Sequence, residues 1–143
     1  MITNERQYAI TKGQVDRFEQ TLSEGIQDSG KPLNPRALRA MRESIASQLQ
    51  DLREEIAEYE KLRDGTTTTI VGNSILDLAV GLVKARIVRN WTQKELADRL
   101  GLPEQQVQRY EATLYKGVAL ERLQEVADAL KVRLREVMTL ERV

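Results

Sequence analysis

The chain contains no cysteine and no histidine among its 143 residues. These two absences exclude disulfide frameworks, thiol nucleophiles, zinc fingers and imidazole acid–base chemistry. Aromatic residues are scarce, with one Phe and one Trp, so the core must be built mainly from aliphatic side chains. No glycine-rich phosphate loop follows a strand pattern, and no serine has an evident base partner. The sequence therefore predicts a protein that is not an enzyme, with no cofactor, no metal and no catalytic residue.

Long apolar runs are missing as well. No stretch of about 18 apolar residues occurs, and the start MITNERQYAITKG lacks the basic-then-apolar plan of a secretory signal. We therefore expect a cytoplasmic protein with no membrane partner. The apolar and charged fractions, 41% and 31%, are typical of globular chains, and the length suits one ordinary domain or one small domain with an extension.

The formal net charge is zero, but the charges are unevenly distributed. Residues 1–73 hold 10 basic and 12 acidic side chains, whereas residues 79–118 hold 7 basic and 4 acidic ones. The whole chain thus gives no sign of a polyanionic partner, but this window is modestly positive.

Two helices are predicted in the first 63 residues. The segment ERQYAITKGQVDRFEQTLSEGI has apolar residues at helical spacing, and the break SGKPLNP follows it. Asn34 is placed to cap a second helix that begins at Pro35 and ends near Arg63. Its apolar positions advance by threes and fours, as in a coiled-coil seam: Met41, Ile45, Leu49, Leu52, Ile56 and Tyr59.

The charges of the second helix oppose its own dipole. Arginines gather at its start and glutamates near its end. An antiparallel hairpin with the first helix would compensate, because Glu19, Glu24 and Asp28 would then lie beside those arginines. A second copy of the helix packed antiparallel would satisfy the same charges, and a merely solvated face is a third interpretation. The charges in question are Arg36, Arg39, Arg42, Glu54, Glu55, Glu58 and Glu60.

The stretch DGTTTTIVGN, residues 64–73, is either a linker or a short strand that pairs with a symmetry mate. Ser74 and Asp77 then have capping-box-like spacing and predict a helix that runs to about Asn90. Everything after it has helical periodicity, including the stripe Leu120, Leu123, Val126, Ala127 and Leu130. A last helical turn or two is predicted over Leu134, Val137, Met138 and Leu140.

The segment TQKELADRLGLPEQQVQRYE, residues 92–111, meets the requirements of a helix-turn-helix. Two short helices that cross steeply need a small residue at the crossing and a turn residue that tolerates positive φ. Ala97 and Gly101 lie four apart and fit these two roles. The inner faces must also be apolar, and the remaining positions are Leu96, Leu100, Leu102, Val107 and Tyr110.

With these positions filled, residues of about 78–140 resemble the helix-turn-helix domain of the phage repressor and Cro (XRE-like) family. The resemblance rests on TQKELADRLGL, on VQRYE, and on LERLQEVADAL for the fourth helix. It implies an all-α fold with a five-helix repressor-like domain, preceded by the N-terminal helical hairpin. We accordingly divide the chain into a module 1–63 for dimerisation or partner binding, a connector 64–73, and a DNA-binding domain 74–143.

The resemblance also implies roles for individual residues. The helix Pro103–Glu111 would enter the major groove of double-stranded DNA, where a glutamine can bond adenine through two hydrogen bonds. The residues expected to face base edges are Glu104, Gln105 and Gln106, with Gln108 on the same polar surface. The alternative is a solvated helix face, since glutamine forms helices well anywhere, and for Glu104 a capping role.

Phosphate contacts are expected from the start of the preceding helix and from the following loop. Thr92 and Gln93 would hold phosphate with help from Lys94. In the loop ATLYKGVA the candidates are Tyr115 and Lys116, although this loop lacks the glycine and proline common in the family. Arg109 would reach a guanine or a phosphate, or else pair with Glu111 or Glu104.

Three functions follow from this pattern. The first is a sequence-specific transcriptional regulator, a homodimeric repressor on a palindromic operator. The second is the antitoxin of a toxin–antitoxin pair, which binds a small toxin through residues 1–63. The third is a helical adaptor whose helix-turn-helix does not touch DNA.

Overall fold

The computed structural model describes residues 1–26 and 34–143, and within these ranges all regular elements are helices. The all-α prediction is therefore confirmed. The chain forms two compact units, Met1–Thr67 and Thr68–Val143, which we describe separately. Apart from Asn34 and Pro35, the predicted break SGKPLNP lies outside the described residues.

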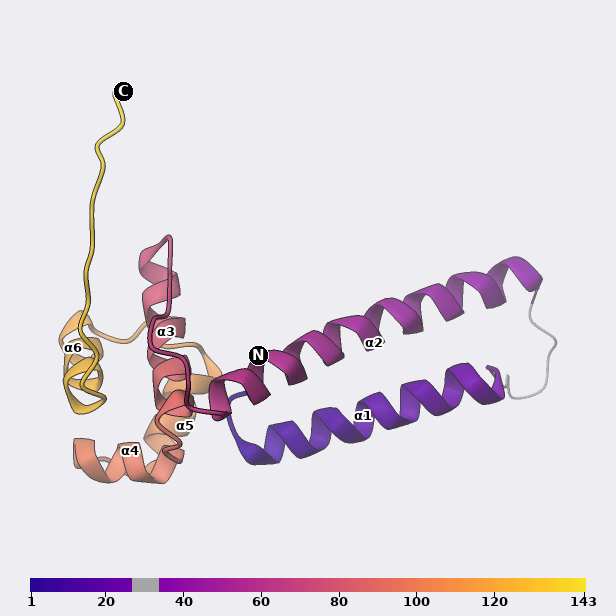
Figure 1. The fold of residues 1–143 in the computed structure, drawn as a ribbon, viewed down its shortest axis with the longest axis horizontal. Helices are drawn as coiled ribbons and strands as arrows, with labels where there is room; N and C mark the ends of the chain where they lie inside the picture. The colour runs from indigo at the N-terminus through magenta and orange to yellow at the C-terminus, as the bar shows by residue number, and fades with distance from the viewer. Residues whose placement is uncertain (27–33) are drawn as a thin grey trace. The chain divides into compact units, whose positions relative to one another are not determined.

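The first unit is a pair of antiparallel helices, α1 (Glu5–Glu24) and α2 (Pro35–Arg63) (Figure 1). Each begins at an asparagine cap. The Asn4 side chain accepts a hydrogen bond from the Gln7 backbone N–H at 2.9 Å, and Asn34 accepts one from the Arg36 N–H at 2.9 Å. Such caps satisfy donors that the first helical turn leaves without partners. Within one chain, the hairpin is thus the arrangement adopted.

The ion pairs of the hairpin differ from the predicted ones. Glu19 pairs with Arg53 and not with the arginines at the start of α2, and Glu24 accepts from Gln20 on its own helix. Arg42 instead donates to the Leu22 carbonyl at 3.4 Å. Asp28 lies outside the described residues. The prediction considered only the net charge at each helix end. Which side chains meet is decided by the register in which the two helices pack.

The hairpin is most tightly packed near the start of α1 and the end of α2. The Tyr8 and Tyr59 rings lie 5.3 Å apart, and the Arg63 guanidinium lies 4.6 Å from the centre of the Tyr8 ring. Glu5 accepts from the Tyr59 hydroxyl at 2.9 Å and from Arg63 at 3.1 Å. In the rest of the predicted seam Leu49 is buried, Ile45, Leu52 and Ile56 are half-buried, and Met41, near the start of α2, is exposed.

The second unit contains α3 (Ile75–Val88), α4 (Gln93–Leu100), α5 (Glu104–Ala112) and α6 (Leu120–Ala129). Residues 66–72 before it carry no regular secondary structure. As predicted, Ser74 caps α3 by accepting from the Asp77 N–H at 3.1 Å. Helix α4 packs on α5 and α6, and α3 packs on α6 (Figure 1). The side chains at the centre are almost fully buried: Leu82, Val83, Leu96, Val107, Val126 and Leu130.

The end of α6 is closed by an unusual residue. Lys131 adopts a left-handed φ of 52°, a conformation in which glycine is the usual choice. The Arg89 side chain donates to the carbonyls of Leu130 and Lys131, the latter at 3.3 Å. Arg89 therefore supplies donors to carbonyls that the end of a helix leaves without partners.

No helix follows α6, so the last turn or two predicted over Leu134–Leu140 is wrong. Four helices make up the second unit, in place of the five expected. The segment after Lys131 is stretched out (Figure 1), and Val137, Met138 and Leu140 are more than nine-tenths exposed. A short helix is stabilised mainly by burying its apolar stripe, and here the apolar side chains are exposed.

The buried crossing of α4 and α5 predicts a steric effect. Ala97 is fully buried, so Ala97→Val should lower the free energy of unfolding by about 1–3 kcal/mol because the added methyl groups force the helices apart. Urea unfolding can be followed by the fluorescence of Trp91, the only tryptophan. Ala112→Val, at an exposed position of α5, is the control and should cost less than about 1 kcal/mol. Equal losses would contradict the packing role of Ala97.

Candidate nucleic-acid interface

The turn between α4 and α5 has the geometry of a helix-turn-helix. Gly101 ends α4 in the left-handed conformation, with φ of 67°, and the Leu102 N–H donates to the Ala97 carbonyl at 2.9 Å. Pro103 is the N-cap of α5, so this helix begins at Glu104, one residue later than predicted. The roles predicted for Ala97 and Gly101 in the crossing and the turn are confirmed.

The start of α4 is fixed by a capping box. The Thr92 hydroxyl oxygen accepts from the Glu95 N–H at 3.1 Å, while the Glu95 carboxylate accepts from the Thr92 N–H at 2.6 Å. Thr92 is exposed. Because its hydroxyl acts as an acceptor in the cap, the hydroxyl proton can still be donated to a ligand. The positive end of the helix dipole lies at the same place.

A buried ion pair joins α3 to α5. Two nitrogens of the Arg86 guanidinium donate to the two carboxylate oxygens of Glu111, at 2.6 and 2.8 Å. The Glu111 side chain has no exposed area and that of Arg86 is 4% exposed. A third nitrogen of Arg86 donates to the Trp91 carbonyl at 2.6 Å. Such a paired fork satisfies both charges and fixes the orientation of both side chains.

Gln93 completes this buried cluster from α4. It is buried, and its amide nitrogen donates to Glu111 at 2.8 Å. The side chain therefore supports the ion pair and does not face solvent, so we do not retain it as a phosphate donor. Arg86 and Glu111 were not predicted to pair. The available signal was an arginine within the apolar run of α3, and a glutamate that ends the segment VQRYE.

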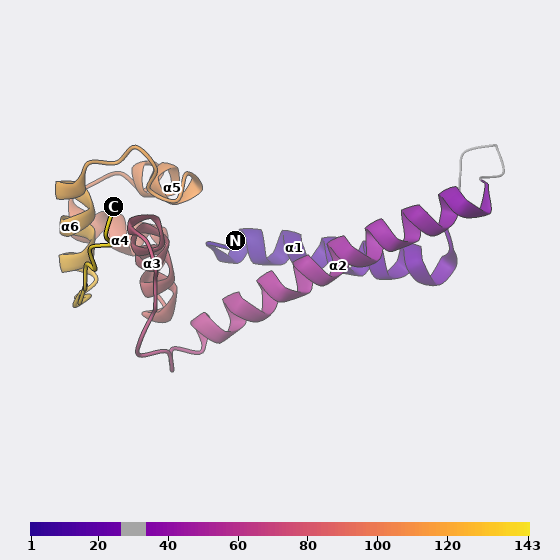
Figure 2. The same cartoon turned by 90° about the horizontal axis from the view of Figure 1, so that it is seen from above.

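The outward surface of α5 carries the predicted base-facing side chains. Gln105 and Arg109 lie one turn apart and are exposed. In the part of the chain that the structure describes, neither side chain makes a hydrogen bond or an ion pair. Gln108 donates to Glu104 at 3.3 Å, and Gln106 is half-buried. Figure 2 shows α5 at the edge of its domain.

Two predicted alternatives concern this surface, and only the first is wrong. Arg109 does not pair with Glu111, because Glu111 points inward to Arg86. Pro103 is the N-cap of α5 and the helix has no side-chain cap hydrogen bond, so the role left for Glu104 at the helix start is electrostatic. Glu104 lies in the first turn, where the positive end of the helix dipole stabilises its negative charge.

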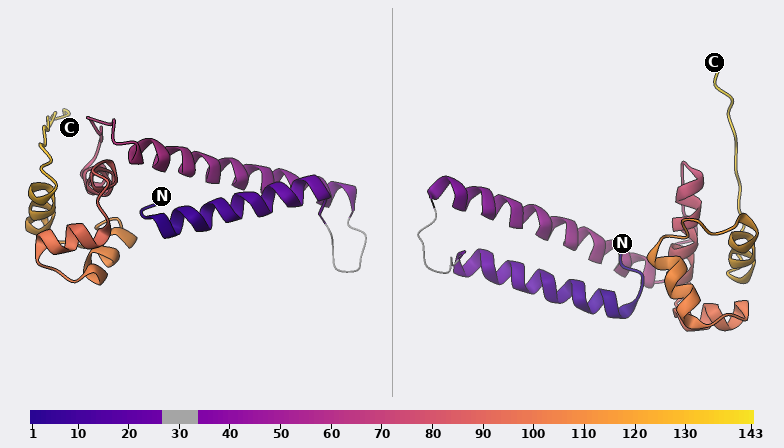
Figure 3. Two further views of the ribbon diagram at one scale, coloured as in Figure 1. Left: turned by 60° about the horizontal axis from the view of Figure 1, so that its bottom comes forward. Right: turned by 180° about the vertical axis from the view of Figure 1, so that it is seen from behind.

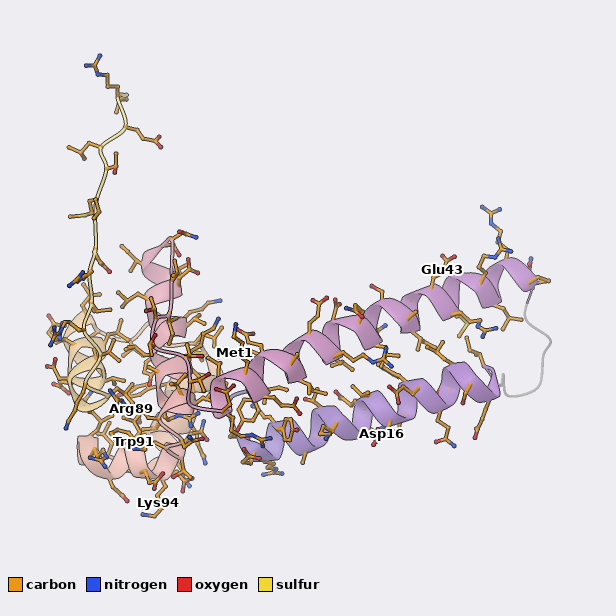
Figure 4. All side chains as sticks on the ribbon, viewed as in Figure 1. Met1, Asp16, Glu43, Arg89, Trp91 and Lys94 are labelled. Carbon is orange, nitrogen blue, oxygen red and sulfur yellow. The ribbon has the colours of Figure 1, made fainter. Side chains whose placement is uncertain are left out.

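Lys94 provides an exposed positive charge beside the start of α4. Figure 4 shows it pointing away from the domain. Its ammonium lies 2.9 Å from the Asp98 carboxylate, and this hydrogen bond raises the pKa of Lys94. The side chain is thus positively charged at neutral pH. An exposed pair of this kind contributes little to stability, so the lysine can exchange Asp98 for another anion at small cost.

The loop after α5 differs from the prediction. Tyr115 is buried, and its ring stacks on Tyr110 with 5.7 Å between the ring centres. Burial raises the pKa of the Tyr115 hydroxyl. Leu114 and Tyr115 both have left-handed φ angles, 52° and 58°, and this backbone turns the tyrosine inward. Tyr115 is therefore not available to a phosphate, whereas Lys116 is exposed.

Comparison with known proteins agrees with this geometry. The family model described as helix-turn-helix matches residues 82–137. This match supports, for these residues, the resemblance to the phage repressor-like helix-turn-helix family. The family is one of DNA-binding regulators. No curated protein and no solved structure matches the chain. Across residues 1–26 and 34–143, no helix is both long enough and apolar enough to span a membrane.

The Arg86–Glu111 pair predicts a large loss of stability when one partner is changed. Glu111→Gln should lower the free energy of unfolding by about 3–5 kcal/mol, because Arg86 is left as a buried charge without its counter-ion. Urea unfolding followed by Trp91 fluorescence measures this. Glu121→Gln, at an exposed position of α6, makes the same chemical change and should have almost no effect.

A double variant tests the cause of that loss. Arg86→Met together with Glu111→Leu removes both charges and should be more stable than Glu111→Gln alone. A double variant that is less stable would mean that the loss comes from packing or from the lost hydrogen bonds to Gln93 and Trp91, and not from the unpaired charge.

Proposed function

We propose that this protein is a sequence-specific transcriptional regulator that inserts α5 into the major groove of double-stranded DNA. One observation carries the proposal. Polar side chains project outward from a helix whose inner side is fixed by a fully buried ion pair, within a domain of a DNA-binding family. Such a helix can present side chains to base edges in a constant orientation.

Gln105 is the first candidate for base recognition. It is exposed in the first turn of α5, where recognition helices meet base edges. A glutamine amide donates and accepts at once, which matches the major-groove edge of adenine. Arg109, one turn further along, suits a guanine or a phosphate. Gln106 and Gln108 lie beside these two, and Glu104 suits only a cytosine amino group or the helix start.

Phosphate binding is assigned to the start of α4 and to the loop after α5. Thr92 offers its hydroxyl proton and Lys94 its ammonium group, next to the positive end of the α4 dipole. Lys116 is the remaining exposed candidate in the loop. Such contacts place the helix on the duplex and carry most of the salt dependence of binding.

The same proposal includes a homodimer that represses from a palindromic operator. A single domain of this size contacts few base pairs, so two copies on half-sites about 34 Å apart supply the required specificity. Toxin binding through residues 1–63 and the adaptor function stay predictions from the sequence. Within the chain, the division at Thr67 falls inside the predicted connector.

Base recognition by Gln105 predicts a loss of discrimination. The operator is first selected from a randomised duplex pool with the unaltered protein. Gln105→Ala should then bind that operator about 5- to 150-fold more weakly, which corresponds to 1–3 kcal/mol for one bidentate base contact. Its affinity for a scrambled duplex should change little.

Gln124→Ala is the matched control, because Gln124 is an exposed glutamine on α6 that bonds Asp128. It should leave both affinities unchanged. If the pool yields no bound sequence at any salt concentration, the DNA-binding proposal is excluded.

Phosphate contacts predict the salt dependence. The logarithm of the association constant should fall linearly with the logarithm of the salt concentration, and Lys94→Gln should make the slope shallower by about 1. Lys61→Gln, on α2, is the control and should leave the slope as it is. A Lys94→Gln slope equal to that of the unaltered protein would remove Lys94 from the interface.

A further inference from the structure

The C-terminal segment 132–143 has several large apolar side chains that are exposed to solvent. Leu134 is 43% exposed, and Val137, Met138 and Leu140 are 91–94% exposed. The family match continues past the end of α6 to residue 137, so the first half of this segment belongs to the domain. An apolar surface of this kind within a domain indicates a partner.

The backbone of the segment is suited to pairing as a strand. It is stretched out beyond α6 in Figure 1 and in the right view of Figure 3. In an extended chain, alternate side chains share a face. One face then carries Leu134, Met138 and Leu140 together with Glu136 and Arg142, and the opposite face carries Val137 and Thr139 between Arg133, Arg135 and Glu141. Val137 and Thr139 are β-branched residues, which are enriched in strands.

The charges select both the partner and the orientation. In a parallel pair of two copies in register, every arginine would lie opposite an arginine, which destabilises a ribbon. In an antiparallel pair centred on Val137, Arg133 lies opposite Glu141 of the second copy and Leu134 lies opposite Leu140. Because of the two-fold symmetry each of these pairs occurs twice. The segment is therefore self-complementary in one orientation.

We propose that residues 132–142 pair antiparallel with the same residues of a second copy, centred on Val137, and so dimerise the DNA-binding domain. The proposal deepens the proposed function by naming the surface of the dimer, and its biological role rests on that function. A two-stranded ribbon alone is only marginally stable. The segment extends toward the side of the domain where α3 begins (Figures 1 and 3). The first residues of that helix, Ile75 and Leu76, are exposed apolar residues as well.

Cross-linking tests the register, because the chain has no cysteine of its own. In the full-length protein without DNA, Val137→Cys should form a disulfide-linked dimer under mild oxidation. The two substituted residues would face each other, with Cα atoms roughly 4.5–5.5 Å apart, within the range that a disulfide spans. Leu134→Cys is the matched control and should not cross-link, because its two copies would lie roughly 20 Å apart along the ribbon.

A charge exchange tests the same register without cysteine. Arg133→Glu should weaken dimerisation on the order of tenfold, since it places like charges opposite each other at two sites. Adding Glu141→Arg should restore the affinity of the unaltered dimer. Light scattering and sedimentation across a concentration series measure the dissociation constant.

Three outcomes overturn the proposal. They are a monomer at all concentrations, equal cross-linking of Val137→Cys and Leu134→Cys, and a dimer in which neither the cysteine nor the charge variants have any effect. The last of these would place the dimer interface elsewhere, for example on the α1–α2 hairpin. Since all these measurements omit DNA, their result is independent of whether Gln105→Ala alters operator binding.

Discussion

The buried ion pair between Arg86 and Glu111 is the interaction on which the orientation of α5 depends. A carboxylate with no exposed area is tolerated only when it is paired and hydrogen-bonded. Here the pair joins α3 to α5, and Gln93 adds α4 to the same carboxylate. Three helices are thus fixed at one point, directly beneath the outward surface of α5. The polar side chains on the outward surface therefore belong to a helix whose position in the domain is fixed.

The parts of the fold that local chemistry determines could be predicted from the sequence. Ser74 and Asn34 cap their helices because a short polar side chain can reach a nearby backbone N–H. Ala97 and Gly101 were identified because a steep crossing leaves few choices of residue. The same reasoning located α4 and α5 to within one residue, which is why the positions of Gln105 and Arg109 on the exposed side could also be anticipated.

What sequence reasoning missed depends on contacts between distant residues. Arg86 and Glu111 are 25 positions apart, and no local pattern shows that they meet. Tyr115 was assigned to DNA from its place in a loop, but two left-handed backbone angles turn it inward. In the C-terminal segment the spacing of Leu134, Val137 and Met138 fits a helix, while Leu134, Met138 and Leu140 fit a strand. Periodicity alone does not separate the two when the segment is short.

The buried cluster of Arg86, Gln93 and Glu111 also determines which substitutions the domain can accept. A change at one of the three positions leaves a buried charge or a buried amide without its partner, so its cost depends on the residues at the other two. The residues on the outer side of α5 carry no such restriction. Substitutions on the outward side of α5 therefore leave the buried cluster intact, so the polar surface of this helix can be altered without rebuilding the domain.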